Sequence, residues 1–290
     1  MQIPRSKNAS ALTQRHIAVK CLLLKIDGKM NLNLYQIDAF ADRVFAGNPA
    51  AVCPLETWLE DEVMQAIAAE NNVAETAFYV PCGDDFEIRW FTPTVEVDLC
   101  GHATLASAYV LYEEQGFDQP SLRFHSKSGI LQVSKKGNLF ELDFPTQECE
   151  PCAIPEGMAA ALGVKSDIIE CLGSDDYLVV LDTEQELMGL EPDFPELGKL
   201  QARGIIVTAA SKQYDFVNRF FGPNVGINED PVTGSAFTKL IPYWAKKLEK
   251  EVLTAKQVSP RGGEVFCQLL GDRVLISGHA KKYMQGMIEI

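Results

Sequence analysis

The chain has few positive charges, few histidines and no long apolar run. Its 40 acidic residues outnumber the 26 lysines and arginines, which gives a formal net charge of −14 at pH 7. Nucleic acids and anionic membranes attract basic surfaces, so we expect neither as a partner. No stretch approaches the roughly 20 consecutive apolar residues of a membrane-spanning helix. We therefore expect a soluble, cytoplasmic protein.

The cysteines and histidines also lack the sequence spacing that is typical of metal sites. The eight cysteines lack the density of a disulfide scaffold and are typical of thiols in a reducing compartment. Cys149 and Cys152 form a single C-x-x-C without a second pair or a histidine at zinc spacing. We interpret it as structural, with a redox or metal role as the alternative. The four histidines show no paired ligand spacing either, so the sequence predicts no metal and no other cofactor.

The 290 residues suffice for two domains of ordinary size, and 47% of them are hydrophobic. Residues 1–29 hold six lysines and arginines but one acid, which predicts a disordered leader. We expect an N-terminal domain over 30–145 and a C-terminal domain over 156–290. The proline-containing stretch 145–155 is the expected linker, and the last strand is expected to cross back to the first domain.

Residues 99–113 predict a buried helix with a reactive start. Cys100, Gly101 and His102 open the stretch, and Ala103 begins a run of small and apolar residues without glycine or proline. A helix that is apolar on nearly all sides belongs inside a domain. Its first N–H groups lack intrahelical partners, and its dipole favours negative charge there. We expect this start to bind an anionic group and to lower the pKa of the Cys100 thiol.

A second stretch of the same design follows about 130 residues later. Asp230 and Pro231 precede Thr233, Gly234 and Ser235, and an apolar helix follows. The backbone N–H groups at this start can also bind an anion. Two such helix starts, facing each other across a cleft between domains, would line one site.

Strands outnumber helices in the rest of the chain, and several of them form hairpins. This favours an α+β fold with mixed, largely antiparallel sheets wrapped on a central helix in each domain. Thr57–Glu60 is a capping-box pattern, which predicts a helix ending near Asn71. The expected strands are 32–40, 73–80, 86–91, 122–124, 129–133, 139–144, 177–181, 204–208, 215–221, 264–269 and 273–277, with a short helix over 156–162.

Three ionisable side chains stand at the polar openings of apolar segments: Glu75, His102 and Asp230. A carboxylate that is partly buried among apolar neighbours is suited to carrying a proton in general acid–base catalysis. Together with the two helix starts, these residues form the candidate site. Taken together, Glu75, His102 and Asp230 are the candidates for catalysis. Taken singly, each has a structural alternative: a strand-end acid for Glu75, a core histidine or helix cap for His102, and a turn residue for Asp230. The residues assigned to substrate binding are Cys100, Gly101, Ala103, Thr233, Gly234 and Ser235.

The motifs around these residues resemble those of the phenazine-biosynthesis F-like (PhzF-like) isomerase family. They occur in order from about residue 31 to the C-terminus. The resemblance implies the fold of diaminopimelate epimerase, in which two pseudo-symmetric α+β domains each curl a sheet around a central helix. The site then lies between the domains. The motifs are 47–50 (GNPA), 72–77 (NVAETA), 100–104 (CGHAT), 224–236 (NVGINEDPVTGSA), 261–263 (RGG) and 271–274 (GDRV).

The resemblance also implies roles for individual residues. Glu75 would be the proton-transferring acid and base, with His102 and Asp230 as its polar partners. The related epimerases use two opposed cysteines, whereas here Cys100 stands at the first position and Asp230 at the second. Tyr109 and Phe237 occupy positions where many relatives are expected to have histidine, so the substrate shape is expected to differ.

The preferred hypothesis is a cofactor-independent isomerase of a small carboxylate-bearing metabolite, in which Glu75 moves a proton and a double bond shifts. The first alternative is a racemase or epimerase that uses Cys100 as one base. The second is a non-catalytic binding protein on the same fold, since a fold does not determine a function. A homodimer is a candidate assembly for any of them.

Overall fold

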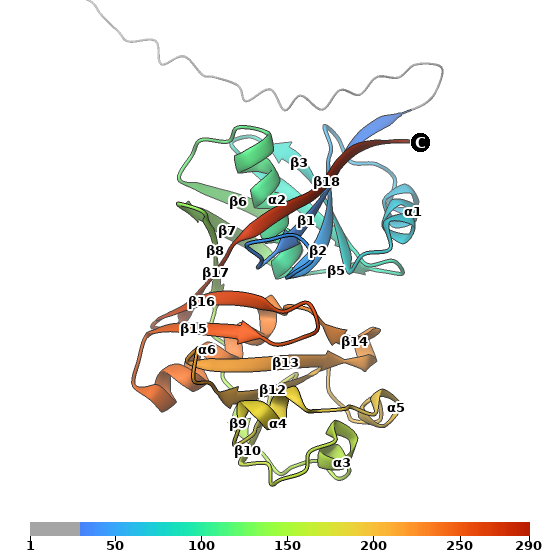
Figure 1. Ribbon diagram of the computed structural model, residues 1–290. Helices are drawn as coiled ribbons and strands as arrows, with labels where there is room; N and C mark the ends of the chain where they lie inside the picture. Colours follow the sequence, from blue (N-terminus) through green and yellow to red (C-terminus); the bar gives the residue numbers. More distant parts are fainter. Residues whose placement is uncertain (1–29) are drawn as a thin grey trace, which may run out of the picture.

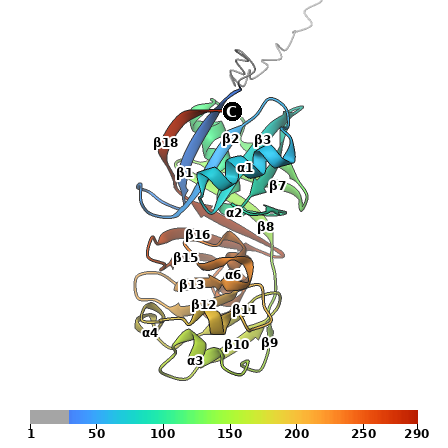
Figure 2. The ribbon, with the colours of Figure 1, turned by 90° about the vertical axis from the view of Figure 1, so that its right-hand side faces the viewer.

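The computed structural model describes residues 30–290, and the expected leader over 1–29 lies outside the described residues. Two lobes stack along the long axis of the molecule (Figures 1 and 2). Within residues 30–290, no helix is long and apolar enough to cross a membrane.

The N-terminal lobe curls a sheet around the helix α2 (Gly101–Tyr109). Every residue of α2 from His102 to Ala108 is buried, and the helix packs against β1, β2, β3 and β8. A short π-helical turn over Val110–Glu114 continues it. The other elements of this lobe are β1 (Asn31–Ala39), β2 (Asn48–Pro54), α1 (Asp61–Asn71), β3 (Glu75–Cys82), β4 (Asp85–Phe91), β5 (Glu96–Val97), β6 (Ser121–Ser126), β7 (Gly129–Lys136) and β8 (Leu139–Pro145).

The C-terminal lobe repeats this arrangement around α6 (Gly234–Leu248), which packs against β15, β16 and β17. A short 3₁₀ turn over Pro223–Val225 precedes β14. The other elements are β9 (Glu150–Pro151), α3 (Met158–Leu162), β10 (Glu170–Gly173), β11 (Tyr177–Val180), α4 (Glu184–Met188), α5 (Phe194–Leu197), β12 (Ile205–Ala210), β13 (Phe216–Gly222), β14 (Ile227–Asp230), β15 (Val252–Gln257), β16 (Gly263–Leu270) and β17 (Arg273–Gly278). The last strand, β18 (Ala280–Glu289), leaves this lobe.

The strand pairings show that the two lobes share one plan. In the N-terminal lobe β2 pairs in parallel with β3, and β4 with β6. In the C-terminal lobe the parallel pairs are β11 with β12 and β13 with β15. A parallel pair needs a crossover connection, which α2 supplies between β4 and β6 and α6 between β13 and β15. Each central helix therefore begins at an equivalent place in its lobe.

Two antiparallel pairings join strands that are far apart in the sequence. β8 pairs with β17, and the last strand β18 pairs with β1 along its length, from Asn31 opposite Glu289 to Ala39 opposite Ala280. Figure 1 shows β18 running up into the N-terminal lobe beside β1. The C-terminal segment is therefore part of the N-terminal lobe's sheet.

The mixed sheet and the two central helices confirm the α+β fold class. The capping box at Thr57 is wrong: α1 begins at Asp61 after Glu60, without a side-chain cap. The indole N–H of Trp58 donates instead to Glu87 on β4. The helix does end at Asn71, as predicted. Part of the stretch 145–155 is strand β9, paired with β10, and the division of the chain into domains at this stretch stays a prediction.

Candidate active site

The start of α2 brings a thiol and an imidazole into the interior. Cys100 precedes the helix in an extended conformation, with φ −145° and ψ 110°. Its carbonyl oxygen accepts hydrogen bonds from the Thr104 hydroxyl at 2.6 Å and the Thr104 N–H at 3.1 Å. Cys100 is 7% exposed, His102 5% and Ala103 0%, so the reactive groups are shielded from bulk water.

The start of α6 is arranged around Asp230, the last residue of β14. One of its carboxylate oxygens accepts the Thr233 hydroxyl at 2.5 Å. Gln257 on β15 accepts the Thr233 N–H at 2.9 Å and donates to the Asp230 carbonyl oxygen at 2.7 Å. The buried polar groups before Gly234 therefore have fixed partners, which orient the first turn of the helix.

The two helix starts touch at their glycines. A β-carbon added to Gly101 would lie 3.5 Å from the Cα of Gly234, and one added to Gly234 would lie 3.4 Å from the Cα of Gly101. The two dipoles therefore meet positive end to positive end, where they favour an anion. The sequence prediction that these helix starts meet is confirmed, whereas the cleft expected between them stays a prediction, because their glycines are in contact.

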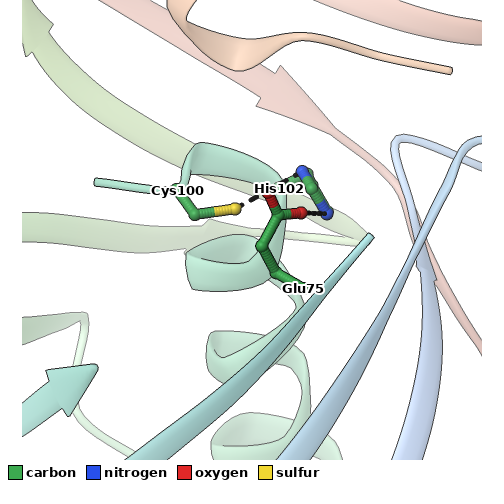
Figure 3. A group of neighbouring side chains, drawn as sticks. All are labelled: Glu75, Cys100 and His102. Atoms are coloured by element: carbon green, nitrogen blue, oxygen red, sulfur yellow. Dashed lines mark hydrogen bonds and ion pairs between the residues drawn. The ribbon is translucent and has the colours of Figure 1, made fainter. Parts of the chain in front are cut away.

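The side chains of Glu75, His102 and Cys100 meet beside this contact (Figure 3). Glu75 begins β3, is 8% exposed, and places its Oε2 atom 3.1 Å from Nε2 of His102. The Cys100 sulfur lies 3.5 Å from the other ring nitrogen, Nδ1. His102 therefore stands between a carboxylate on one ring nitrogen and a thiol on the other.

Asn48, the first residue of β2, connects the two lobes at this site. Its amide nitrogen donates to Asp230 Oδ1 at 2.8 Å and to the Val232 carbonyl oxygen at 3.0 Å, and lies 3.2 Å from His102 Nδ1. Asn48 is fully buried, and its own Oδ1 makes no hydrogen bond within residues 30–290. Asn48 is not among the site residues predicted from the sequence, because an asparagine before a proline is also typical of a turn.

The expected lowering of the Cys100 pKa is wrong. Burial, and next the charge of Glu75, raise the pKa of this thiol to about 11, and the smaller effect of His102 does not offset them. Desolvation of the thiolate outweighs the helix dipole, because the sulfur is buried beside a carboxylate. Cys100 is therefore a neutral thiol near pH 7.

His102 and Asp230 also have shifted pKa values. Burial disfavours the imidazolium, but charge on Cys100 and on Glu75 raises the pKa of His102 well above its ordinary value. Of these two groups the Glu75 carboxylate lies nearer to the ring, at 3.1 Å against 3.5 Å for the Cys100 sulfur. Burial raises the pKa of Asp230 to about 6, and His102, Thr233 and Asn48 act against that rise. A carboxyl group with a pKa near neutrality, such as that of Asp230, is suited to a site of proton transfer.

Glu75, Cys100 and His102 also offer one oxygen, one sulfur and one nitrogen within 4.8 Å of one another. Zinc is bound by such atoms. Here, however, the sulfur approaches Nδ1 and the carboxylate approaches Nε2. One ion binds one ring nitrogen, so contact with all three residues would require a side chain to turn. The arrangement fits proton transfer better than metal binding.

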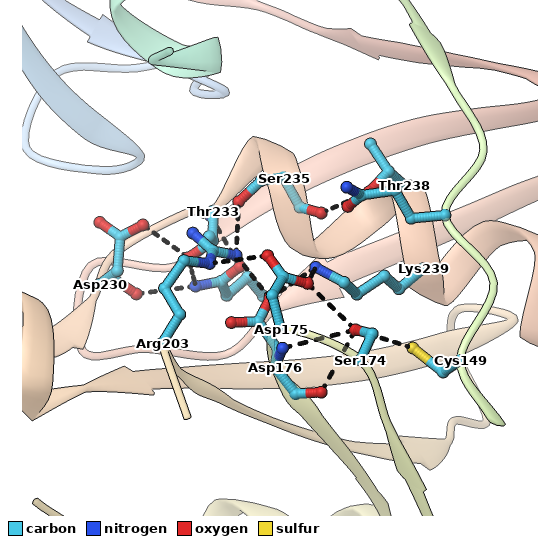
Figure 4. A network of polar contacts seen from close by, with 12 residues as sticks. Cys149, Ser174, Asp175, Asp176, Arg203, Asp230, Thr233, Ser235, Thr238 and Lys239 are labelled. Carbon is cyan, nitrogen blue, oxygen red and sulfur yellow. Dashed lines mark hydrogen bonds and ion pairs between the residues drawn. The ribbon is translucent and has the colours of Figure 1, made fainter. Parts of the chain in front are cut away.

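A cluster of charged side chains lies against the start of α6 and consists of Asp175, Asp176, Arg203 and Lys239 (Figure 4). Lys239 is 1% exposed, and its Nζ atom lies 2.7 Å from Asp176 and 2.9 Å from Asp175. Arg203 bonds Asp176 at 2.5 Å and donates to the Ser235 hydroxyl at 3.2 Å. Buried charges require partners, and this pairing also holds Ser235 in place. The isolated Arg203 carries no sequence motif that would have identified it.

The two lobes share one plan and meet at the starts of α2 and α6, beside the buried side chains of Glu75 and His102. This arrangement defines an epimerase-like isomerase fold. The chain belongs to the family of phenazine biosynthesis-like proteins (PhzC-PhzF), whose signature matches residues 37–286. Membership in this family supports the isomerase class that the sequence predicted.

Relatives and solved structures agree with this assignment. An uncharacterized isomerase of Pseudomonas aeruginosa is 54% identical over 261 residues, covering 90% of this chain and all of that protein. A PhzF-family crystal structure from Enterococcus faecalis has a TM-score of 0.87 and 48% identity, covering 89% of this chain and 99% of that one. A predicted epimerase of Pseudomonas aeruginosa, at 24% identity and the same coverage, has a TM-score of 0.71 and shows the shared fold.

Proposed function

We propose that this isomerase acts on a small carboxylate-bearing metabolite and shifts a proton between two carbons without a cofactor. Glu75 removes an acidic C–H proton and returns it at another carbon, so that a double bond moves. The observation that carries the proposal is the 3.1 Å pairing of Glu75 with His102 beside two touching helix starts. A proton carrier and an anion site are thereby adjacent.

The helix starts supply the binding part of the reaction. Backbone N–H groups near Gly101 and Gly234 point out of the first turns of α2 and α6. They would bind the substrate carboxylate and stabilise the negative charge that develops when the C–H proton leaves. The free Oδ1 of Asn48 offers an acceptor for a substrate N–H or O–H group.

His102 and Asp230 would support the proton transfer rather than perform it. His102 would orient the Glu75 carboxylate, whose Oε2 atom lies 3.1 Å from Nε2 of the ring. Asp230 lies on the far side of His102 and is joined to it through Asn48. Because all three side chains are less than 10% exposed, substrate entry would require the Gly101–Gly234 contact to open.

The racemase alternative assigns one proton transfer to Cys100. The raised pKa of this thiol weakens it as a base near neutral pH, since little thiolate is present. The isomerase proposal needs no chemistry from Cys100, and Cys100→Ala separates the two mechanisms. The variant retains most activity under the proposal and loses nearly all of it under the racemase alternative.

Proton NMR in deuterium oxide tests the proposal across a range of candidate substrates. The purified chain would be incubated with a panel of small carboxylic acids that carry an acidic C–H, including unsaturated acids and L-amino acids. We expect at least one unsaturated acid to give a product with a displaced double bond. Inversion of an amino acid at one carbon, with deuterium from solvent, would support the racemase alternative instead. A thermal shift by a panel member without any turnover would favour a binding protein.

A further inference from the structure

Cys171 lies on strand β10 of the C-terminal lobe, opposite Cys152, which directly follows strand β9. β9 and β10 are antiparallel, with Leu172 opposite Pro151, and the next pair in this register is Cys171 with Cys152. The Cys152 N–H donates to the Cys171 carbonyl oxygen at 2.9 Å. Directly opposite residues of such a pair have Cβ atoms about 4.5–5.5 Å apart, close to the separation in a disulfide. The two thiol sulfurs are 3.7 Å apart.

The two thiols differ in access and reactivity. Cys152 is exposed, whereas Cys171 is 7% exposed. Burial, and next the neighbouring Cys152, raise the pKa of Cys171 to about 12. The thiolate is the nucleophile in thiol–disulfide exchange, so Cys152 is the thiol that meets an oxidant in solution.

We propose that Cys152 and Cys171 form a reversible disulfide when the chain meets a disulfide oxidant of the glutathione type. The Cys152 thiolate attacks one sulfur of the oxidant, forms a mixed disulfide and releases one glutathione thiolate. The Cys171 thiol then loses its proton to solvent and attacks the Cys152 sulfur. The Cys152–Cys171 bond forms and the second glutathione thiolate leaves. Two thiols are thereby oxidised and one glutathione disulfide is reduced.

The C-x-x-C spacing alone would instead pair Cys149 with Cys152. These two residues flank strand β9, and three residues of strand span about 10 Å. That exceeds the roughly 7 Å limit between the Cα atoms of a disulfide. The Cys149 thiol also has another partner, the Ser174 hydroxyl at 3.6 Å. The sheet register therefore selects a pair that the sequence motif does not.

The bond would fasten the segment between the lobes to the C-terminal lobe. It would close the chain from Cys152 through α3 to Cys171, and the turn after β10 carries Asp175 and Asp176. Asp176 is the carboxylate that bonds both Lys239 and Arg203. The oxidation site thus lies in the strand that leads directly into the cluster supporting α6.

Peptide mapping under non-reducing conditions tests this proposal. The full chain would be treated with oxidised glutathione, its remaining thiols alkylated, and the protein digested. We expect one linked peptide pair containing Cys152 and Cys171, two hydrogen atoms lighter than the two free peptides together, which dithiothreitol separates. Cys152→Ser should abolish the pair, and the matched variant Cys149→Ser should leave it unchanged.

Three results would overturn the proposal. They are a bond between Cys149 and Cys152, stable glutathione adducts on Cys152 without the internal bond, and the absence of any linked pair. Because Cys152 is exposed, Cys152→Ser should fold normally, and circular dichroism of both variants verifies this. None of these readouts depends on the proposed isomerase reaction.

Discussion

Replacing Glu75 by glutamine should lower the pKa of His102, because it removes the anion beside the imidazolium. The two atoms are 3.1 Å apart. At an effective dielectric constant near 20, a charge pair at this separation is worth about 5 kcal/mol as an upper value. The amide of glutamine keeps the hydrogen-bonding capacity but carries no charge, so we expect the pKa of His102 to fall.

The imidazole nitrogen signals of His102, followed by NMR from pH 5 to 10, measure this effect. In the wild type the midpoint of the His102 titration should lie well above 6.5, and in Glu75→Gln it should be lower. His125, which pairs with Asp85 at 2.8 Å, serves as the internal control and should not change. Because the folded-state pKa is raised, the stabilisation from the pair is complete below about pH 6.5 and is lost as the pH rises through the folded-state value. A wild-type His102 that titrates near 6.5, or a pKa unaffected by Glu75→Gln, would refute the reasoning.

Three further predictions concern the same site. Cys100 should be alkylated by iodoacetamide at least about tenfold more slowly than the exposed Cys82, because it is buried with a raised pKa. Mass spectrometry of the digested protein measures both rates, and equal rates would contradict the burial of Cys100. The pKa of Asp230 is raised from 3.8 to about 6 by burial, so the free energy of unfolding should fall by about 3 kcal/mol as the pH rises from 4 to 6. Urea unfolding of the wild type should show this fall in the free energy of unfolding, and the fall should be smaller in Asp230→Asn. If the free energy of unfolding depends on pH identically in both proteins, the raised pKa of Asp230 is contradicted. Prolonged dialysis against EDTA should leave turnover unchanged, and a loss that zinc restores would mean that Glu75, Cys100 and His102 do bind a metal.

The repeated helix starts could be predicted because their signal is local. A thiol or an acid, then glycine and small residues, then an apolar run indicates a buried helix with a polar start, and α2 and α6 both follow this pattern. In the structure, the two repeated stretches form equivalent crossover connections, from β4 to β6 and from β13 to β15. Family motifs then assigned Glu75, His102 and Asp230 to one site, where the structure brings them together.

Features that depend on tertiary contacts could not be predicted. Asn48 could not be selected, because its hydrogen bond joins the start of β2 to Asp230 of the other lobe, 182 residues away. The Cys100 pKa depends on how deeply the thiol is buried and on the carboxylate of Glu75, neither of which a helix N-terminus reveals. Likewise, the pairing of Cys152 with Cys171 follows from strand register rather than from sequence spacing.

The central claim, that Glu75 carries the proton, is tested most directly by the turnover of Glu75→Gln on the substrate found in the carboxylic acid panel. The exposed Glu70, changed to glutamine, provides the matched control. General acid–base catalysis contributes roughly 10²–10⁴-fold, so we predict a fall in kcat of at least about 100-fold, with little change in substrate affinity and none in the control. A folded Glu75→Gln variant that turns over substrate at nearly the wild-type rate would contradict the account.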